Sequence, residues 1–371
     1  MNSLTVLFTE SSKNFGGQQR RLITEACLLA EAGCRVEIAC PRDSQLAGKA
    51  AAAGIPVNYV PMRASAHPAS LAALFRLVIR LKPDVLYSHS GHDSWLSGIV
   101  GLLTKTPLVR SRELLTPVRS PIAYRLPCRV LACGEAVKRQ LVEAGVPSGK
   151  IFIQYPPIET ARYSYVTASA SASVRQELRI DGHFPVILCA GQFRPEKRQE
   201  DLVRALALMV QEFPSALLVL AGQGSEMQRV RDIVRDMDLA DQVRFPGERE
   251  DIPALLSVSD IYAFPSAMEP FGMGPVEAMA AGVPVVASRT GGLAEIVEEG
   301  KNGLLVPPCD PEALASALSA LSRDAILRNS LSAAGRERAR FFDSGNAMQR
   351  LLEHFHDVTR TPSKGVISLS L

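Results

Sequence analysis

Apolar residues along the first half of the chain follow two alternating patterns. Short, continuous apolar runs such as Val6-Leu7-Phe8 are typical of strands that are covered on both faces of a sheet. Longer segments, such as residues 18–33 (QQRRLITEACLLAEAG), have apolar residues at the spacing of a helix. The alternation predicts repeated βα units that form a parallel sheet with helices on both faces.

The same alternation starts again after a short break. Residues 166–173 (VTASASAS) are small and polar without an apolar period, which predicts a linker. From residue 186 (VILCAG) onward, strand-like and helix-like segments again take turns. A chain of 371 residues also suits two domains better than one. We therefore predict an α/β protein with two doubly wound, Rossmann-like domains, at residues 1–165 and 174–345.

Composition and charge narrow the choice of partners. With 47% hydrophobic residues, the chain has the composition of a globular protein. Its net charge of +3 combines unlike halves, because residues 1–165 contain 20 basic and 11 acidic residues and the remainder contains 21 and 27. The basic half suits an anionic acceptor or an anionic membrane surface, unless it is ordinary charge scatter. Nucleic acid is not an expected partner.

The cysteines and the N-terminus indicate the compartment. None of the 7 Cys belongs to a C-x-x-C pair, and several lie within strand-like runs, so neither a metal cluster nor a disulfide framework is predicted. The N-terminus, MNSLTVLFTESS, has no basic leader, and no run of about 18 uninterrupted apolar residues occurs. We expect a cytoplasmic protein that needs no metal and no cofactor.

Residues 269–288 (EPFGMGPVEAMAAGVPVVAS) carry the most chemical information. Gly272 and Gly274 have no side chains and let main-chain N–H groups approach an anion closely. A helix is predicted to follow, and its N-terminus would suit a phosphate. Glu277, expected in the first turn of this helix, would turn toward ribose hydroxyls, and Glu269 would face a sugar. Alternatively, Glu277 favours the helix dipole and Glu269 is a solvated loop charge.

This segment resembles the donor site of the retaining glycosyltransferases of family 4, which have the GT-B fold. The E-x7-E spacing of that family is matched by Glu269 and Glu277 without a gap. The resemblance is clear over residues 186–345 and looser in the N-terminal half. It implies two domains that face one another across a cleft, a nucleotide-diphosphate sugar as donor, and a last segment, 346–371, that packs back on the first domain. Phe271 and Met273 are then donor-binding candidates as well.

The resemblance also implies a cation at the donor diphosphate. Lys197 matches the lysine of the family signature G-R-L-x-x-x-K-G, which neutralises the diphosphate. A cation is chemically required there, because the departing diphosphate gathers negative charge. The arginine of the signature is Gln192 in this chain, and Arg194 is the candidate to replace it. Alternatively, Lys197 and Arg198 are solvated residues before a helix.

In the N-terminal half, a glycine pair follows the first predicted strand. Gly16 and Gly17 resemble the pair that faces the donor phosphates in the family. Arg20 and Arg21 would either reach phosphate or lie on a helix face in water.

Acceptor-side candidates follow the strand predicted in DVLYSHSGHDSWL. His89 could orient a sugar hydroxyl or donate to its oxygen, with His92 nearby, or could be a structural histidine. Asp93 could instead cap the following helix. Where many relatives have another histidine, this chain has Arg112, and with Arg110 it would suit a phosphorylated or carboxylated acceptor.

Together these residues imply an enzyme. The resemblance implies a retaining, metal-independent hexosyl- or heptosyltransferase that moves a sugar from a nucleotide-diphosphate sugar to a saccharide or glycolipid, in cell-envelope polysaccharide or lipopolysaccharide biosynthesis. Two alternatives remain open: a nucleotide-sugar 2-epimerase of the same fold, and a catalytically weak donor-binding subunit.

The segment 70–82 (SLAALFRLVIRLK) combines an apolar stripe with flanking cations. Leu71, Leu74, Phe75 and Val78 form the stripe. Such a helix either packs on its sheet or lies on a membrane, so peripheral contact with an anionic membrane is a further possibility.

Overall fold

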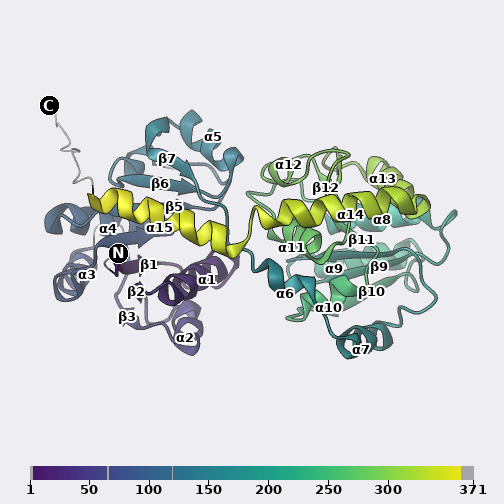
Figure 1. The fold of residues 1–371 in the computed structure, drawn as a ribbon, viewed down its shortest axis with the longest axis horizontal. Coiled ribbons are helices and arrows are strands. Elements are labelled where there is room, and N and C mark those ends of the chain that lie inside the picture. The colour runs from purple at the N-terminus through teal and green to yellow at the C-terminus, as the bar shows by residue number, and fades with distance from the viewer. Residues whose placement is uncertain (1–2, 65–66, 119, 361–371) are drawn as a thin grey trace. The chain divides into compact units, whose positions relative to one another are not determined.

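The structure is a computed structural model that describes residues 3–64, 67–118 and 120–360. The chain forms two compact units (Figure 1). The N-terminal unit contains Met1–Pro157 and Ser344–Leu371, and the C-terminal unit contains Ile158–Asp343. The tail predicted within 346–371 lies outside the described residues from position 361 onward.

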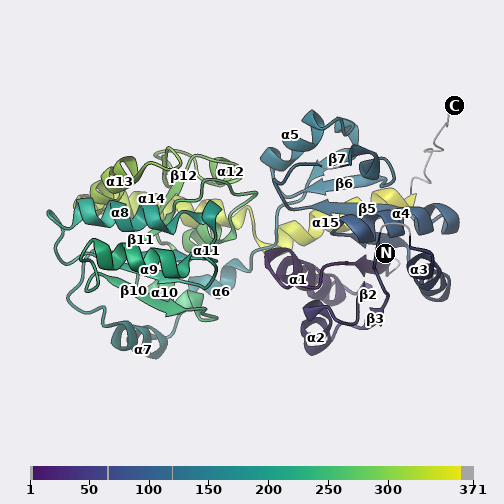
Figure 2. The ribbon, with the colours of Figure 1, turned by 180° about the vertical axis from the view of Figure 1, so that it is seen from behind.

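A parallel sheet of seven strands forms the centre of the N-terminal unit. The strand order is β3-β2-β1-β4-β5-β6-β7, and the order reverses between β1 and β4. Helices cover both faces, with α1, α2 and α15 on one side and α3 and α4 on the other (Figures 1 and 2). The strands are β1 (Thr5–Thr9), β2 (Arg35–Cys40), β3 (Val57–Tyr59), β4 (Val85–Ser88), β5 (Leu108–Arg112), β6 (Arg129–Ala132) and β7 (Ile151–Ile153). The helices are α1 (Gly17–Glu31), α2 (Gln45–Ala52), α3 (Pro68–Leu81), α4 (Gly91–Thr104), η1 (Pro121–Tyr124), α5 (Glu135–Glu143), η2 (Ser148–Lys150) and α15 (Ser344–Arg360).

The C-terminal unit repeats this architecture with six parallel strands. Their order is β10-β9-β8-β11-β12-β13, with the reversal between β8 and β11. The strands are β8 (Val186–Ala190), β9 (Leu217–Ala221), β10 (Val243–Gly247), β11 (Ile261–Phe264), β12 (Val285–Ser288) and β13 (Leu304–Val306). The helices are α6 (Thr160–Ser164), α7 (Ala168–Leu178), η3 (Pro195–Lys197), α8 (Gln199–Met209), α9 (Met227–Asp236), α10 (Ile252–Ser257), α11 (Met273–Ala281), α12 (Leu293–Ile296), α13 (Pro311–Arg323) and α14 (Ala325–Arg340).

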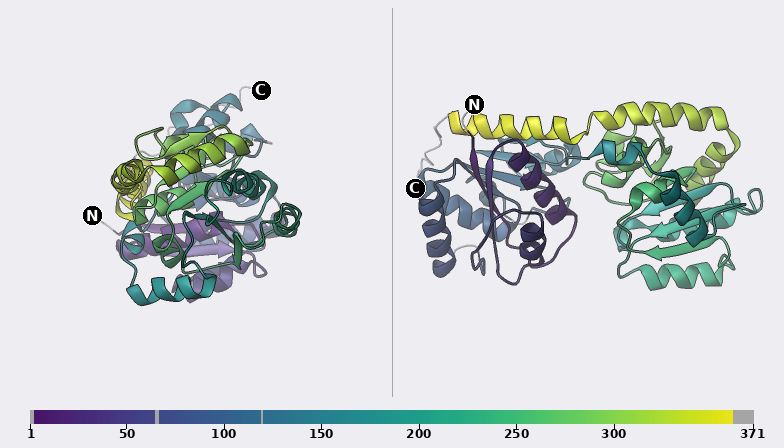
Figure 3. Two further views of the ribbon diagram at one scale, coloured as in Figure 1. Left: turned by 90° about the vertical axis from the view of Figure 1, so that its right-hand side faces the viewer. Right: turned by 60° about the horizontal axis from the view of Figure 1, so that its bottom comes forward.

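The continuous apolar runs have the role predicted from their pattern. Every residue of β4, β9 and β12 is buried, because helices cover both faces of each sheet (Figure 3). The prediction of an α/β protein with two parallel, doubly wound sheets is confirmed.

The predicted linker, however, is helical. Most of residues 166–173 belong to α7, which begins after Thr167, whose Oγ1 accepts a hydrogen bond from Ala170 N at 3.3 Å. Alanine has a high helix propensity, and the buried side chains of Val174 and Leu178 hold α7 in place. The chain passes between the units at Pro157–Ile158 and Asp343–Ser344, so the predicted domain boundary between residues 165 and 174 was wrong.

The last helix, α15, is part of the N-terminal unit. Leu351 and Phe355 are fully buried in the core that also contains Phe8. Arg129 of β6 donates to Asp357 at 2.9 Å and holds the outer face of α15. Both ends of the chain therefore build one core. In the described part of the chain, no helix is long and apolar enough to span a membrane.

Candidate functional site

In the C-terminal unit, Lys197 and Glu269 meet where the strand order reverses. Lys197 ends η3, after β8, and Glu269 lies in the loop between β11 and α11. The Lys197 ammonium forms an ion pair with Oε2 of Glu269 and lies 5.0 Å from the centre of the Phe264 ring. Ligands of doubly wound sheets bind at the carboxyl ends of the strands at this reversal. Two predicted site residues that are far apart in sequence are thus brought together where a ligand is expected.

Main-chain hydrogen bonds hold the loop that carries Glu269. Ala267 N donates to Glu196 O at 2.8 Å, and Gly292 N donates to Glu269 O at 2.9 Å. Thr290 Oγ1 donates to Ala267 O at 3.0 Å. These bonds fix the carboxylate next to η3, so the ion pair does not depend on side-chain attraction alone.

Packing requires glycine at two positions where α11 begins. Gly272 has a φ of +107°, and a Cβ there would lie 2.6 Å from Leu293 Cδ2. A Cβ on Gly274 would lie 2.2 Å from the hydroxyl oxygen of Tyr262, which donates to Ala190 O at 3.1 Å. Phe271, next to this turn, is buried, and Met273 begins α11. The main chain at Gly272 and Gly274 therefore packs closely against the core of the unit.

Glu277 has a protein partner. Because α11 begins at Met273, Glu277 lies beyond its first turn, and the prediction of a first-turn position was wrong. Its carboxylate is hydrogen-bonded to Tyr163 of α6, and burial together with this carboxylate raises the pKa of Tyr163. A carboxylate has several lone pairs, so the bond to Tyr163 leaves acceptor capacity for a ligand hydroxyl.

Gln192 and Arg194 lie on the same loop as Lys197, and both are exposed. Gln192 contributes its main-chain oxygen to the fold, because Gln199 Nε2 donates to it at 3.0 Å. Arg194 Nη1 lies 4.0 Å from Glu196 Oε1. Among the described residues, no hydrogen bond or ion pair joins either side chain to that of Lys197, and their donor-binding roles stay predictions.

In the N-terminal unit, the turn at Gly16 is linked through Gln19 to a buried carboxylate, Glu10, that the sequence pattern did not reveal. Gly16 N donates to Gln19 Oε1 at 2.9 Å. Gln18 and Gln19 in turn donate from Nε2 to Glu10 Oε2, at 2.7 and 3.0 Å. Glu10 directly follows β1, and its place at a strand end was the signal that could have revealed it.

His89 is deeply buried just after β4. Its ring stacks on Phe8 at a centroid distance of 5.5 Å and meets the edge of Tyr87 at 4.4 Å. Nδ1 lies 3.4 Å from Thr9 O, whereas Nε2 is buried and has no hydrogen-bond partner. Burial, with the charge of Arg21, lowers the pKa of His89 to about 3. The imidazole is therefore neutral at pH 7, and a contact with Thr9 O requires the proton on Nδ1, which leaves Nε2 as an acceptor.

The other acceptor-side candidates differ in exposure. His92 is exposed in the first turn of α4, and Asp93 caps that helix by accepting from His89 N and Ser90 N at 2.9 and 3.0 Å. Arg110 is buried, its guanidinium carbon is 3.8 Å from the centre of the Tyr124 ring, and its Nε and Nη1 have no hydrogen-bond partner. Arg112 donates from Nη2 to Thr116 O and thereby holds the following loop.

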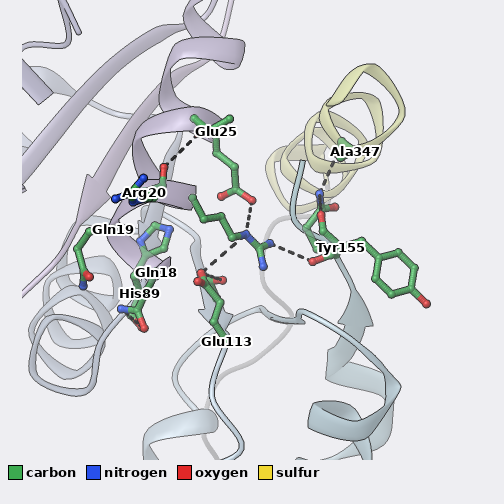
Figure 4. Close-up of polar contacts among 12 residues, drawn as sticks. Gln18, Gln19, Arg20, Glu25, His89, Glu113, Tyr155 and Ala347 are labelled. Atoms are coloured by element: carbon green, nitrogen blue, oxygen red, sulfur yellow. Dashed lines mark hydrogen bonds and ion pairs between the residues drawn. The ribbon is translucent and has the colours of Figure 1, made fainter. Parts of the chain in front are cut away.

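Arg21 cannot contribute a phosphate contact from an exposed helix face, because it is buried in an ion network. Its Nε lies 2.8 Å from Glu25 Oε1 and 3.8 Å from Glu113 Oε1, and its Nη2 donates to Gln154 O at 3.0 Å (Figure 4). Burial raises the pKa of Glu113 to about 7, although the Arg21 charge opposes this shift. The network joins α1 to the ends of β5 and β7.

Comparison with known proteins identifies the class. The family described as "Glycosyl transferases group 1" matches residues 171–338, and "Glycosyltransferase Family 4" matches residues 15–162. The solved structure of HepE from Anabaena in complex with UDP-glucose has a TM-score of 0.84 and 25% identity, over 96% of this chain and all of that one. The fold and the site thus define a glycosyltransferase with the GT-B fold.

Curated relatives show the family. A D-inositol 3-phosphate glycosyltransferase of Kineococcus radiotolerans is 30% identical over 73% of this chain and 70% of its own length. Another, from Corynebacterium urealyticum, is 31% identical over 60% of this chain, but the match spans 55% of that relative's length. The chain belongs to glycosyltransferase family 4, the family of the group 1 glycosyl transferases.

Proposed function

We propose that this glycosyltransferase moves a sugar from a nucleotide-diphosphate sugar to a saccharide or glycolipid, with retention at the anomeric carbon. The observation that carries the proposal is the Lys197–Glu269 pair at the reversal of the C-terminal sheet. It combines a cation for a diphosphate with a carboxylate for sugar hydroxyls, the two charges that such a donor needs. The similarity to HepE, whose structure was solved in complex with UDP-glucose, supports this class of donor and makes UDP-glucose the first one to test.

Donor binding would replace the ion pair with new contacts. Lys197 would turn from Glu269 to the diphosphate and stabilise the charge that develops as the bond between the anomeric carbon and phosphate oxygen breaks. Glu269 would then accept hydrogen bonds from the sugar. Glu277 would accept a hydrogen bond from the ribose. Gly272 and Gly274 would offer main-chain N–H groups to the phosphates.

The transfer itself is a same-face displacement. The acceptor hydroxyl oxygen forms the new bond to the anomeric carbon, its proton moves to the departing phosphate oxygen, and the nucleotide diphosphate leaves. No metal ion and no cofactor takes part in this proposal. The protein supplies position and charge stabilisation.

His89 and Arg110 are proposed to act on the acceptor. With Nε2 as an acceptor, a neutral His89 would receive a hydrogen bond from a sugar hydroxyl and orient it. The free N–H groups of Arg110 would bind a carboxylate or phosphate on the acceptor. His92 and Arg112 are proposed as further acceptor contacts, and Gly16 and Gly17 as contacts of the donor. We place the reaction in the cytoplasm, in the synthesis of a cell-envelope polysaccharide or lipopolysaccharide.

The decisive experiment combines donor binding with turnover. Lys197→Ala is expected to lower UDP-glucose turnover by on the order of a hundredfold and to weaken binding of UDP-glucose much less, because the cation acts mainly on the charge of the transition state. Lys301→Ala, which removes an exposed lysine that pairs with Glu298 in the same unit, is the matched control. Equal turnover of both variants would refute the site.

Product analysis distinguishes transfer from the alternatives. A transferase without acceptor should release UDP from UDP-glucose only slowly, and the anomeric coupling in the transferred sugar reports retention. Conversion of UDP-glucose to its 2-epimer without acceptor would establish the epimerase instead. If the protein bound UDP-glucose but transferred no sugar to any component of an envelope extract, it would be a donor-binding subunit instead.

A further inference from the structure

The outer face of the α3–α4 pair is unusually apolar for a surface. Phe75, Ile79, Leu102 and Leu103 are 37%, 52%, 55% and 69% exposed. They project from two helices that lie side by side, whereas the opposite faces of the same helices supply the core residues Leu74, Val78 and Val100. The predicted stripe on residues 70–82 is therefore divided, because Leu74 and Val78 are buried but Phe75 is not.

A groove between these helices adds to the apolar surface. It has a volume of about 270 Å³, and apolar residues alone line it. The lining residues are Leu71, Ala72, Phe75, Ile99, Val100 and Leu103. Large contiguous apolar patches on a protein surface mark sites of contact with another molecule or a membrane.

Cations border this face. Arg76 and Arg80 each follow an exposed apolar residue of α3, and Lys105 directly follows the end of α4. Between residues 60 and 107, Asp84 and Asp93 are the acidic residues of the sequence. Asp93 is buried as a helix cap, and the Asp84 carboxylate accepts from Thr5 N at 2.7 Å. The rim thus has an excess of positive charge.

We propose that this α3–α4 face docks on the surface of a bilayer that carries anionic lipid headgroups. Apolar side chains at the centre would enter the boundary between headgroups and acyl chains, and Arg76, Arg80 and Lys105 would contact lipid phosphates. A protein partner is less well matched, since charges of a single sign around an apolar centre fit a continuous anionic plane. The proposal goes beyond the proposed transfer reaction, although a glycolipid acceptor would give docking an evident use.

Vesicle sedimentation of the full chain tests the proposal without donor or acceptor. The wild-type protein is expected to sediment with vesicles of phosphatidylglycerol and phosphatidylethanolamine, and much less with phosphatidylcholine alone. The variant Ile79→Ser/Leu103→Ser should lower the bound fraction about tenfold or more, because two apolar side chains no longer enter the bilayer. The variant Arg76→Gln/Arg80→Gln/Lys105→Gln should do the same for anionic vesicles only.

Two controls keep the result interpretable. Ile326→Ser removes a side chain that is 83% exposed in the C-terminal unit and should bind vesicles like the wild type. All variants should keep the melting temperature and its rise on adding UDP-glucose, because the changed side chains are exposed or lie at the rim. If both face variants bound anionic vesicles as well as the wild-type protein does, the proposal would be overturned. A dimer in gel filtration that Ile79→Ser/Leu103→Ser dissociates would overturn it too, and would assign the face to a second copy of the chain.

Discussion

At Gly274, one hydrogen atom in place of a side chain decides how α11 begins. An added Cβ would lie 2.2 Å from the Tyr262 hydroxyl oxygen, which is fully buried with its ring. We expect Gly274→Ala to lower the free energy of unfolding by about 1–3 kcal/mol, because an extra methyl group would be forced against a buried ring. Denaturant unfolding measures the change.

Removal of the hydroxyl tests the cause. Tyr262→Phe alone should cost about 1 kcal/mol, since Ala190 O loses its donor. In the Gly274→Ala/Tyr262→Phe double variant, the two losses should be less than additive, because the clash is relieved. Strict additivity would show that the Cβ clashes with something other than this oxygen.

The Glu113 carboxyl should give the stability of the N-terminal unit a dependence on pH. Its pKa is raised from 4.5 to about 7 in the folded protein, chiefly by burial. Between these values the folded state binds more protons than the unfolded state, so the free energy of unfolding falls as pH rises. Glu113→Gln cannot release a proton and should lack this fall, which amounts to at most about 3 kcal/mol.

The difference between variant and wild type is the quantity to measure. Plotted against pH, the free energy of unfolding of Glu113→Gln minus that of the wild type should increase from pH 4.5 to about pH 7 and then level off. Asp93, whose pKa is also raised to about 7, is present in both proteins and cancels. Parallel profiles would mean that Glu113 is not buried as described.

At the scale of elements, variants at the contact between α6 and α11 can distinguish a structural role of Glu277 from a role in donor binding. Tyr163→Phe removes the hydroxyl that is bonded to Glu277 and should cost about 1 kcal/mol of stability while donor binding is retained. Glu277→Ala should cost a similar amount and in addition weaken UDP binding by about tenfold, as expected for a lost charge-assisted hydrogen bond. Calorimetric titration with UDP gives both affinities. Equal binding by the two variants would reduce Glu277 to a support for α6.

At the scale of the whole molecule, the N-terminal unit depends on the far end of the chain. A chain that ends at Asp343 lacks α15, and with it the core residues Met348, Leu351, Phe355 and Val358. Each buried apolar side chain contributes about 1.5–3 kcal/mol, and the sum is comparable to the stability of a domain. We expect the N-terminal unit to remain unfolded in this chain.

Scanning calorimetry can follow the two units separately. The chain that ends at Asp343 should keep the unfolding transition of the C-terminal unit, whose core contains no residue of α15. A chain that ends at Arg360 keeps α15 whole and should retain both transitions. A cooperative N-terminal transition without α15 would refute the shared core.

Local pattern alone was enough to predict the fold class. Continuous apolar runs indicate strands covered on both faces, and this signal lies within each segment of sequence. Glu269, Glu277 and Lys197 were chosen because they match the motifs of the family, and their donor roles stay predictions. The prediction of a linker at residues 166–173 was wrong. The helix there depends on the burial of Val174 and Leu178 in the C-terminal unit, and composition does not reveal this burial.

Tertiary structure decided which polar groups meet and which are buried. It joined Lys197 to Glu269, gave Glu277 a partner in Tyr163, placed Arg21 between Glu25 and Glu113, and left Phe75 and Leu103 at the surface. These outcomes depend on contacts between segments far apart in the chain. The energy of a charge or an apolar side chain is set by the neighbours and the water around it, and only the folded chain determines those.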